Sequence, residues 1–349
     1  MSNFFSKLSS YFSRDMAIDL GTANTLIYTK EDGVVLNEPS IVAAEIQGET
    51  LTPYAFGNEA KMMVGKTPAK IQAIRPLKDG VIADFKITEA MIRHFIKTIN
   101  KSNWFFKPKI IICVPSTSTS VERRAIQDAA EGAGAKVAFL IEEPMAAAIG
   151  AGLPVHEATG SMIVDIGGGT TEVAIISLGG VVYGYSLRIG GDRIDEAIVQ
   201  YVRKEYNVLI GEMTAEKVKK TIGTAKVEGL SKEREMIVKG RDLVNGIPKQ
   251  IILTEVEIAE ALQDNVQKMI DSIRTALEHS PPELASDIIE RGITLTGGGS
   301  LLRNLDKAIS IYTGIKVNVA DEPLYCVVKG TGFVLNNIQQ YKHLIFRQE

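Results

Sequence analysis

The chain has 349 residues, of which 45% are hydrophobic and 23% charged, a composition typical of a folded globular protein with room for two cores. A formal net charge of -3 provides no concentrated basic surface, so we expect no nucleic-acid partner. Cys113 and Cys326 are the only cysteines and no apolar stretch approaches the roughly 18 residues of a spanning helix, which together favour a cytoplasmic protein over an exported, disulfide-linked or membrane-spanning one.

The first residues of the chain carry an apolar stripe. Its members have the spacing of one side of a helix and are Phe4, Phe5, Leu8, Tyr11 and Phe12. A helix over residues 1–14 with this pattern would lie on a membrane surface with these side chains in the lipid. Because basic residues are few in this segment, a disordered tail or a helix packed on its own protein remains the alternative.

Two copies of one glycine-containing turn are the most specific feature of the sequence. The first is Asp19-Leu20-Gly21-Thr22-Ala23-Asn24-Thr25 and the second is Asp165-Ile166-Gly167-Gly168-Gly169-Thr170-Thr171. Short runs of strand-forming residues flank each turn, so we expect each to be the tip of an antiparallel hairpin. The similarity continues at Gly33-Val34-Val35-Leu36 and Gly180-Val181-Val182-Tyr183, which indicates a duplicated half-molecule.

Between the two turns the first half contains a mixed segment and then regular structure. The proline-containing residues 36–70 are interpreted as a small inserted subdomain. Thr88 is expected to cap an amphipathic helix that extends to position 99, and a strand at 110–114 and a helix at 121–132 follow. The intervening Trp104-Phe105-Phe106, with a lysine nearby on each side, reads as an exposed loop and a second candidate membrane contact.

The second half repeats strand, turn and strand, and Gly190-Gly191 then opens a helix. In residues 211–249 charged and β-branched residues alternate, which favours a second inserted subdomain of a helix and edge strands. Thr254 is expected to start a long amphipathic helix that ends before Pro281. A third glycine turn, Gly297-Gly298-Gly299, follows a strand, and Ser300 is the expected N-cap of the next helix.

The paired turns have the chemistry of a phosphate-binding site. Glycine lets backbone N–H groups approach a phosphate closely, and threonine hydroxyls add further donors. Asp19 and Asp165 would repel a phosphate, so we assign them to a hydrated Mg²⁺ whose waters bridge to the phosphates. The third turn would let backbone meet the α-phosphate or the adenine of ATP, with a helix N-terminus behind it. Two ordinary Gly–Thr hairpins are the alternative.

Glu143 is the candidate catalytic residue. It lies where a strand ends before Pro144, and we expect it to hold a water in line with the γ-phosphate, with the Thr170 hydroxyl as a second water-orienting group. Glu142 would point to the opposite side of the pleat. The alternative role for Glu143 is to cap the next helix, whose small residues at 146–148 permit close packing.

Three further residues have two interpretations each. Asp192 is either a magnesium or water contact or the cap of its helix, and the cap is favoured. Glu216 and Lys219, one turn apart on a predicted helix, would meet a ribose and an adenine, but an i,i+3 surface ion pair explains the same spacing.

At these residues the chain resembles the actin, sugar kinase and seventy-kilodalton heat-shock ATPase superfamily, and most closely its bacterial actins, the MreB family. The matching segments are IDLGTANT (18–25), VERR (121–124), IEEPMAAAIG (141–150) and TGGGSLL (296–302). The resemblance covers nearly the whole chain. It implies an α/β actin-like ATPase fold, in which two duplicated α/β domains flank a nucleotide cleft and each carries a smaller inserted subdomain. The expected first domain is 15–155 plus 325–349 with insert 36–70, and the second is 156–324 with insert 191–249.

The resemblance also implies functional details. It assigns nucleotide-facing positions to Glu216, Lys217, Val218 and Lys219. It implies paired antiparallel protofilaments at the inner face of the cytoplasmic membrane, and partners such as the rod-shape proteins MreC, MreD and RodZ. The chain departs from the family pattern at Thr117-Ser118-Thr119-Ser120, where a glycine is usual, so the local turn there is not predicted.

Three functions fit these patterns. The favoured one is a cytoskeletal ATPase whose filaments guide peptidoglycan synthesis in a rod-shaped bacterium, with slow hydrolysis of ATP coupled to polymer turnover. A small-molecule kinase of the same fold is the second, but no further polar cluster beyond Glu143 is evident for its substrate. A chaperone ATPase is the third, and the short remainder after the helix expected from Gly332 leaves no room for a peptide-binding domain.

Overall fold

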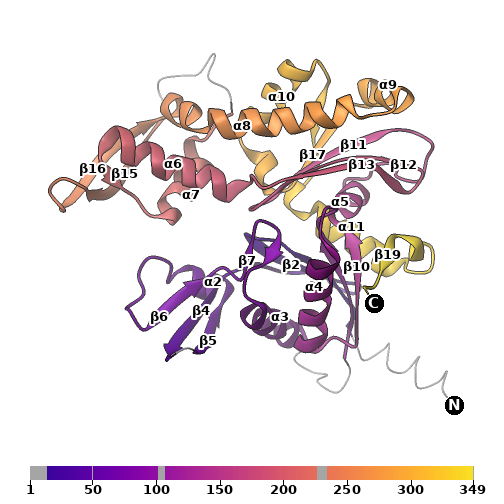
Figure 1. Cartoon of the computed structure of the whole chain (residues 1–349), viewed down its shortest axis with the longest axis horizontal. Helices are drawn as coiled ribbons and strands as arrows, with labels where there is room; N and C mark the ends of the chain where they lie inside the picture. Colours follow the sequence, from indigo (N-terminus) through magenta and orange to yellow (C-terminus); the bar gives the residue numbers. More distant parts are fainter. Residues whose placement is uncertain (1–13, 49, 101–106, 226–233, 349) are drawn as a thin grey trace.

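The first lobe is built on a six-stranded mixed sheet in the order β19-β10-β9-β1-β2-β3 (Figure 1). The computed structural model describes residues 14–48, 50–100, 107–225 and 234–348. The strands of this sheet are β1 (Met16–Leu20), β2 (Asn24–Thr29), β3 (Gly33–Pro39), β9 (Lys109–Val114), β10 (Val137–Glu142) and β19 (Ile345–Phe346). β1 and β2 form the predicted antiparallel hairpin, and β9 runs parallel to β1 on its other side.

The second lobe repeats this arrangement. Its five-stranded sheet has the order β13-β12-β11-β17-β18. The strands are β11 (Ser161–Ile166), β12 (Thr171–Ser177), β13 (Gly180–Leu187), β17 (Ile293–Thr296) and β18 (Val317–Val319). β11 and β12 form the second predicted hairpin, and β17 runs parallel to β11 as β9 does to β1. Each hairpin tip therefore lies beside the carboxyl end of a parallel strand.

Amphipathic helices cover the two sheets. They are α3 (Phe85–Ile99), α4 (Ser120–Ala133) and α5 (Glu143–Gly150) in the first part of the chain, and α6 (Gly191–Tyr206), α8 (Glu255–Glu278), α9 (Pro282–Arg291), α10 (Leu305–Thr313) and α11 (Cys326–Asn336) in the second. α8 begins as predicted, because Thr254 and Glu257 form a capping box. Its apolar side, including Leu262 and Ile273, is fully buried, and each such side chain contributes roughly 1.5 to 3 kcal/mol.

A small sheet projects from each lobe on the same side of the molecule (Figure 1). The first has the order β5-β4-β6 and the second β14-β15-β16. The elements are β4 (Val42–Gln47), β5 (Thr50–Phe56), α2 (Gly57–Lys61) and β6 (Ile71–Ile74), and then β14 (Val208–Leu209), α7 (Glu212–Ile222), β15 (Glu235–Asp242) and β16 (Pro248–Thr254). A short hairpin, β7 (Leu77–Lys78) and β8 (Val81–Ile82), and the 3₁₀ turns η1 (Gly298–Leu301), η2 (Pro323–Tyr325) and η3 (Lys342–Leu344) complete the described elements.

α5 and α11 pack against each other between the two lobes. A Cβ on Gly150 would lie 1.8 Å from the carbonyl oxygen of Cys326, and one on Gly330 would lie 1.9 Å from that of Ala146. The backbones can approach this closely only because neither glycine has a side chain. The predicted close packing of the small-residue helix is therefore confirmed, and it occurs at the junction of the lobes.

The predicted caps of α3 and α10 are wrong, and another cap occurs where no local structure was predicted. The cap of α3 is Asp84, whose carboxylate accepts the Ile87 N–H at 3.0 Å, whereas Thr88 lies inside the helix. Ser300 donates its hydroxyl to Gly297 O at 2.7 Å instead of capping α10, which starts after Asn304. In the segment that departs from the family pattern, Thr119 forms a capping box with α4.

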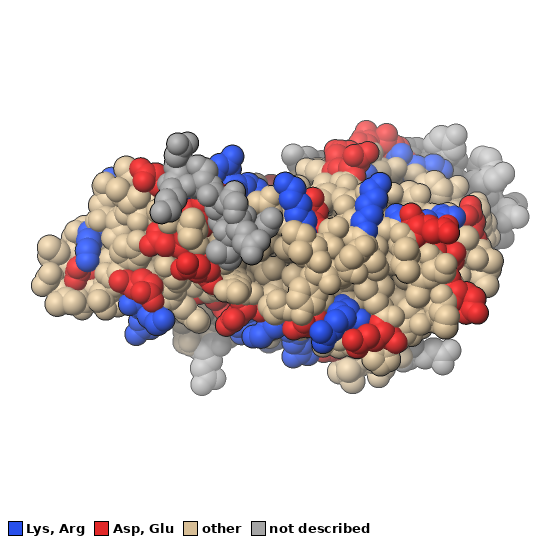
Figure 2. All heavy atoms as spheres, turned by 90° about the horizontal axis from the view of Figure 1, so that it is seen from above, with Lys and Arg blue, Asp and Glu red and all other residues tan. Residues whose placement is uncertain are grey.

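The residues that are predicted to contact a membrane are not among those that the structure describes. Phe4, Phe5, Leu8, Phe12 and the run Trp104-Phe105-Phe106 lie outside the described residues. Within the described ranges, no helix is long and apolar enough to cross a bilayer. Seen from above (Figure 2), acidic and basic side chains are interspersed, and neither sign forms a continuous patch on the face shown.

Candidate functional site

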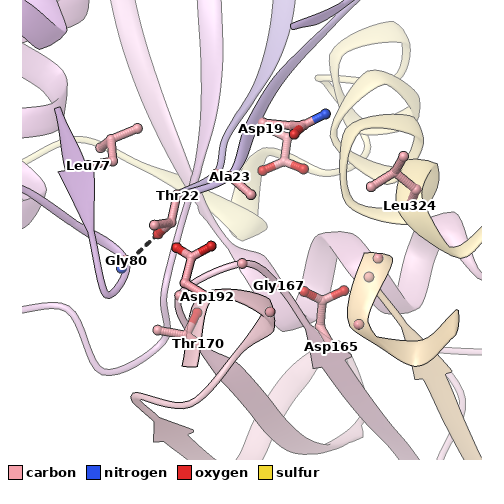
Figure 3. Close-up of a pocket in the computed structure, with 18 of the residues that line it drawn as sticks. Asp19, Thr22, Ala23, Leu77, Gly80, Asp165, Gly167, Thr170, Asp192 and Leu324 are labelled. Carbon is pink, nitrogen blue, oxygen red and sulfur yellow. Dashed lines mark hydrogen bonds between the residues drawn. The ribbon is translucent and has the colours of Figure 1, made fainter. Parts of the chain in front are cut away.

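A cavity of about 490 Å³ lies between the lobes, and both hairpin tips line it (Figure 3). The predicted site residues along its wall are Asp19, Gly21, Thr22, Ala23, Asn24, Glu143, Asp165, Gly167, Gly168, Gly169, Thr170, Glu216, Lys219, Gly297, Gly298 and Gly299. The structure thus brings together segments from positions 19 to 299 of the chain. Pockets of a few hundred cubic ångströms are of the size that small ligands occupy.

The two hairpin tips meet at this cavity from opposite lobes. A Cβ on Gly168 would lie 2.5 Å from the Cβ of Ala23, and one on Gly169 would lie 2.6 Å from the Thr22 hydroxyl oxygen. Only glycine permits so close an approach of two backbones. The Thr22 hydroxyl also accepts the Gly80 N–H at 3.1 Å, which ties the first tip to the β7–β8 turn.

Three carboxyl groups converge at the floor of the cavity. Figure 3 shows Asp19 and Asp165 entering it from the two lobes, and Glu143 is hydrogen-bonded to Asp165. Burial, reinforced by the charge of Asp165, raises the pKa of Asp19 to about 8. Burial raises the pKa of Asp165 to about 6, although the Thr296 hydroxyl bonds to it at 2.7 Å. Burial and the neighbouring acids also raise the pKa of Glu143 well above its ordinary value.

These carboxylates are of the chemical kind that a hydrated divalent cation contacts, although within the described residues no group of three His, Cys, Asp or Glu side chains is placed to hold a metal ion directly. Among the described residues, no lysine or arginine forms an ion pair with Asp19, Asp165 or Glu143. Hard carboxylate oxygens are the ligands that Mg²⁺ prefers, commonly through its waters. A dication here would remove the repulsion between the carboxylates, so the residues present fit a hydrated Mg²⁺.

Glu143 enters the cavity from the first turn of α5. The N-cap of α5 is Glu142, and no side chain caps this helix, so the alternative role of Glu143 as a cap is wrong. Glu142 points away, as predicted, and lies 3.6 Å from Arg123 on α4. Thr170 lines the cavity from the second lobe. The two candidate water-orienting groups therefore belong to different lobes.

Asp192 does not have the helix-capping role that the sequence favoured. The N-cap of α6 is Gly190 and no side chain caps this helix, so Asp192 is not a cap. It lies in the first turn of α6 and lines the cavity. Burial raises its pKa, while the charges of Arg75 and Lys219 oppose the rise. Asp192 is therefore a candidate for contact with a bound metal or water.

α7 presents only part of the predicted set to the cavity. Glu216 and Lys219 line it, whereas Lys217 is exposed elsewhere and Val218 is fully buried in the core of the second lobe. Successive residues of an α-helix point about 100° apart, so four consecutive side chains cannot all face one site. The prediction is corrected for the side chains of Lys217 and Val218.

The alternative ion pair between Glu216 and Lys219 is also wrong. Lys219 instead lies 2.8 Å from Asp195 on α6, and Glu216 lies 2.8 Å from Lys61 and 2.6 Å from Lys220. Burial alone would raise the pKa of Glu216, but its bonds to the two lysines lower this pKa to about 2.

Three ion pairs join the lobes near the mouth of the cavity. Lys61 on α2 reaches Glu216, Arg75 reaches Glu212 on α7, and Asp79 lies 3.7 Å from Arg193 on α6. Apart from Glu216, sequence reasoning missed the residues of these pairs, and it also missed the cavity-lining Asp195 and Arg303. The partners of each pair are more than a hundred positions apart, so no local pattern could have found them. Asp195, one turn after Asp192, carried the only local signal.

The chain is similar to known proteins in both sequence and fold. A family model described as MreB/Mbl protein matches residues 13–343. The cell shape-determining protein MreB of Escherichia coli (strain K12) is 57% identical over 98% of this chain and 99% of that protein. Crystal structures of MreB5 of Spiroplasma citri bound to ADP and to AMPPNP, at 38% and 39% identity, each have a TM-score of 0.88 and cover 95% of this chain and 98% of theirs. The MamK double helical filament, at 20% identity, has a TM-score of 0.76 over 92% of this chain and 99% of that one, and so shares the fold.

Proposed function

The chain belongs to the MreB/Mbl protein family, and from this premise we propose that it is an actin-like, filament-forming ATPase that determines rod cell shape by organising peptidoglycan synthesis at the membrane. The observation that carries the proposal is the contact of the two hairpin tips across one cavity, with Asp19 and Asp165 below them. This is the arrangement that a metal-bound triphosphate needs, since backbone N–H groups bind its phosphates while carboxylates hold the cation's waters.

In the proposed mechanism the backbone N–H groups of both tips bind the phosphates, and Asp19 and Asp165 hold a hydrated Mg²⁺. When bound, the ion neutralises charge on the phosphates. Glu143 orients the attacking water and accepts its proton as the general base. Thr170, on the opposite wall, bonds to the same water. Glu216 and Lys219 contact the nucleoside, and Gly297 to Gly299 contact the α-phosphate or the base.

Filament assembly and membrane attachment complete the proposal. We assign the domains as 15–155 plus 325–349 and 156–324, with the nucleotide between them. Copies of the chain would assemble into paired antiparallel protofilaments on the inner face of the cytoplasmic membrane. Phe4, Phe5, Leu8, Phe12 and Trp104 to Phe106 would contact lipid, weakly in one copy and firmly along a filament. MreC, MreD and RodZ are the proposed partners in the cell.

Co-pelleting with anionic liposomes in Mg-ATP, followed together with phosphate release, tests this function. We expect ATP-dependent sedimentation and slow release of phosphate. Deletion of residues 1–13 should spare assembly in the absence of lipid but reduce the fraction bound to liposomes. A chain that stays monomeric and phosphorylates a sugar would instead be a kinase, and one that ignores nucleotide would refute the proposal.

A further inference from the structure

Glu172 is a buried carboxylate that the mechanism above does not use. It lies on β12 and is the register partner of Asp165 on β11, so both side chains are on the same face of the sheet. Its exposed fraction is 0%, and it forms no ion pair within the described residues. Burial of a charged group is costly unless hydrogen bonds satisfy it. The hydrogen bonds that Glu172 accepts therefore account for its place in the fold.

These bonds come from both lobes. Ser116, in the first lobe just after β9, donates its hydroxyl to Glu172 Oε2 at 3.2 Å, and its backbone N–H also bonds to this carboxylate. Ser186 on β13, in the second lobe, donates its hydroxyl to Oε1. Arg123 holds the other side of the Ser116 segment by donating to Ser116 O at 3.0 Å. One carboxylate thus links the loop after β9 to the second sheet.

The link lies near both proposed water-orienting groups. Thr170 is two residues before Glu172 at the tip of the same hairpin. Glu143 follows β10, the strand beside β9, and Pro115 directly before Ser116 lines the cavity. A Cβ on Gly80 would lie 3.2 Å from both Pro115 and Thr170, so the two walls are already in close packing there. A shift of the Ser116 loop would change how these walls face each other.

We propose that Glu172 is a positioning residue for hydrolysis. Through its bonds to Ser116 and Ser186, it holds the side of the cavity that carries Glu143, in the first lobe, against the side that carries Thr170, in the second. Glu172 does not line the cavity, so it acts through these walls and not on the nucleotide. Phosphates are held by the tips themselves, so the link governs the rate of the reaction more than the binding of ATP. The inference rests on the proposed ATPase function.

Single-turnover hydrolysis of Mg-ATP and nucleotide affinity, measured on the full chain, test the inference. Glu172→Ala should slow hydrolysis about tenfold while nucleotide affinity stays within about twofold. Glu172→Gln should restore most of the rate, because a carboxamide still accepts from one serine and can donate to the other. Unchanged hydrolysis in Glu172→Ala, or loss of affinity in proportion to the rate, would overturn the proposal.

The two serines provide a matched comparison. Ser116→Ala removes the hydroxyl bond between the lobes and should slow hydrolysis more than Ser186→Ala, which removes a bond within one lobe. Ser116→Ala combined with Glu172→Ala should be no slower than Glu172→Ala alone. Equal losses from both serine variants, or additive losses in the combination, would contradict an interlobe role. If Glu172→Ala does not fold, the serine pair still decides the question.

The outcome is separable from that of the proposed function. If the parental chain does not hydrolyse ATP, the ATPase proposal fails. Suppose instead that the parental chain hydrolyses ATP and that Glu143→Gln slows this hydrolysis whereas Glu172→Ala does not. In that case only the positioning role of Glu172 fails.

Discussion

At the residue scale, three carboxyl groups determine the chemistry of the cavity. Asp19, Asp165 and Glu143 are close together and, among the described residues, have no basic partner. Ionising all three without a cation would leave repelling charges away from water. The same groups become favourable when a dication is placed among them. If Mg-nucleotide binds here as proposed, it would therefore stabilise a cluster that is costly when its groups are ionised alone.

The pH dependence of stability follows from these shifts. The pKa of Asp19 rises from 3.8 to about 8, that of Asp165 to about 6 and that of Glu172 to about 7. The folded ligand-free protein thus holds more protons than the unfolded chain, and its stability falls as pH rises from about 4 to about 8. Thermal unfolding should show this loss, and Mg-ADP should raise Tm more at about pH 8 than at about pH 5.5.

A variant isolates the contribution of one carboxyl. Asp19→Asn cannot ionise, so the Tm of the ligand-free protein should fall less steeply between about pH 6 and 8, and Mg-ADP should bind less tightly. A parental Tm that rises across this range would show that the acidic cluster does not control stability.

Glu143 can be compared with its neighbour Glu142. Glu143→Gln should retain ATP but lower the hydrolysis rate by about 10² to 10⁴, the usual contribution of a general base. Glu142→Gln is the matched control, because Glu142 points toward Arg123 and away from the cavity. Phosphate release measured at saturating Mg-ATP distinguishes them. Parental rates in Glu143→Gln would assign the water-orienting role to another residue.

At the scale of elements, ion pairs at the mouth of the cavity join α2 and the β6–β8 segment of the first lobe to α6 and α7 of the second. Arg75 and Glu212 are partly exposed, with side-chain exposures of 30% and 45%, so one pair contributes at most about 1 kcal/mol. All three pairs nevertheless oppose the same separation of the lobes, because each joins the first lobe to the second. Opening of the mouth requires all three to separate.

Removal of one of these pairs should speed nucleotide release. Glu212 does not line the cavity, so Glu212→Gln alters the pair with Arg75 without removing a lining side chain. Stopped-flow release of a fluorescent ADP should be at most about fivefold faster, and the difference should shrink at high salt. Glu278→Gln, which removes an exposed pair within α8, is the control and should leave the rate unchanged. Equal release rates for both variants would exclude a role for this pair in closure.

At the scale of the whole molecule, the lobes are held at two places. The helices α5 and α11 lie side by side between the lobes (Figure 1) with their backbones in contact. The ion pairs lie at the cavity mouth. The cavity lies between a closely packed helix junction and a charged opening. We therefore expect a ligand bound at the tips to change the angle between the lobes more easily than the packing of the helix pair.

The helix junction tolerates no added side chain. Gly330→Ala would place a methyl group against Ala146 O, so we expect a loss of about 1 to 3 kcal/mol in unfolding free energy. Gly211→Ala is the control, because a Cβ there meets nothing within 4 Å and should change stability by about 0.5 kcal/mol or less. Urea denaturation measures both. Equal stability of the two variants would mean that the helices can separate without cost.

Local patterns were sufficient for the parts of the fold that depend on near neighbours. Both hairpins form where strand-forming runs flank Asp19 and Asp165, and α8 begins at Thr254 because its partner Glu257 is three residues away. The favoured capping role of Asp192 failed for the opposite reason, since glycine occupies the N-cap and the carboxylate turns to the cavity. The family was also recognisable by resemblance, because the motifs that carry it, such as residues 18–25 and 141–150, are contiguous in sequence.

Only the tertiary structure decided which side chains meet across the lobes. The pairing of Lys61 with Glu216, the direction of Val218 into the core and the bonds from Ser116 and Ser186 to Glu172 depend on how the two sheets are placed. No spacing rule links residues so far apart, since their contacts arise from packing of whole elements. The amino-acid sequence therefore determined the paired glycine turns by itself, whereas the packing of the two lobes determined which side chains face each other across the cavity.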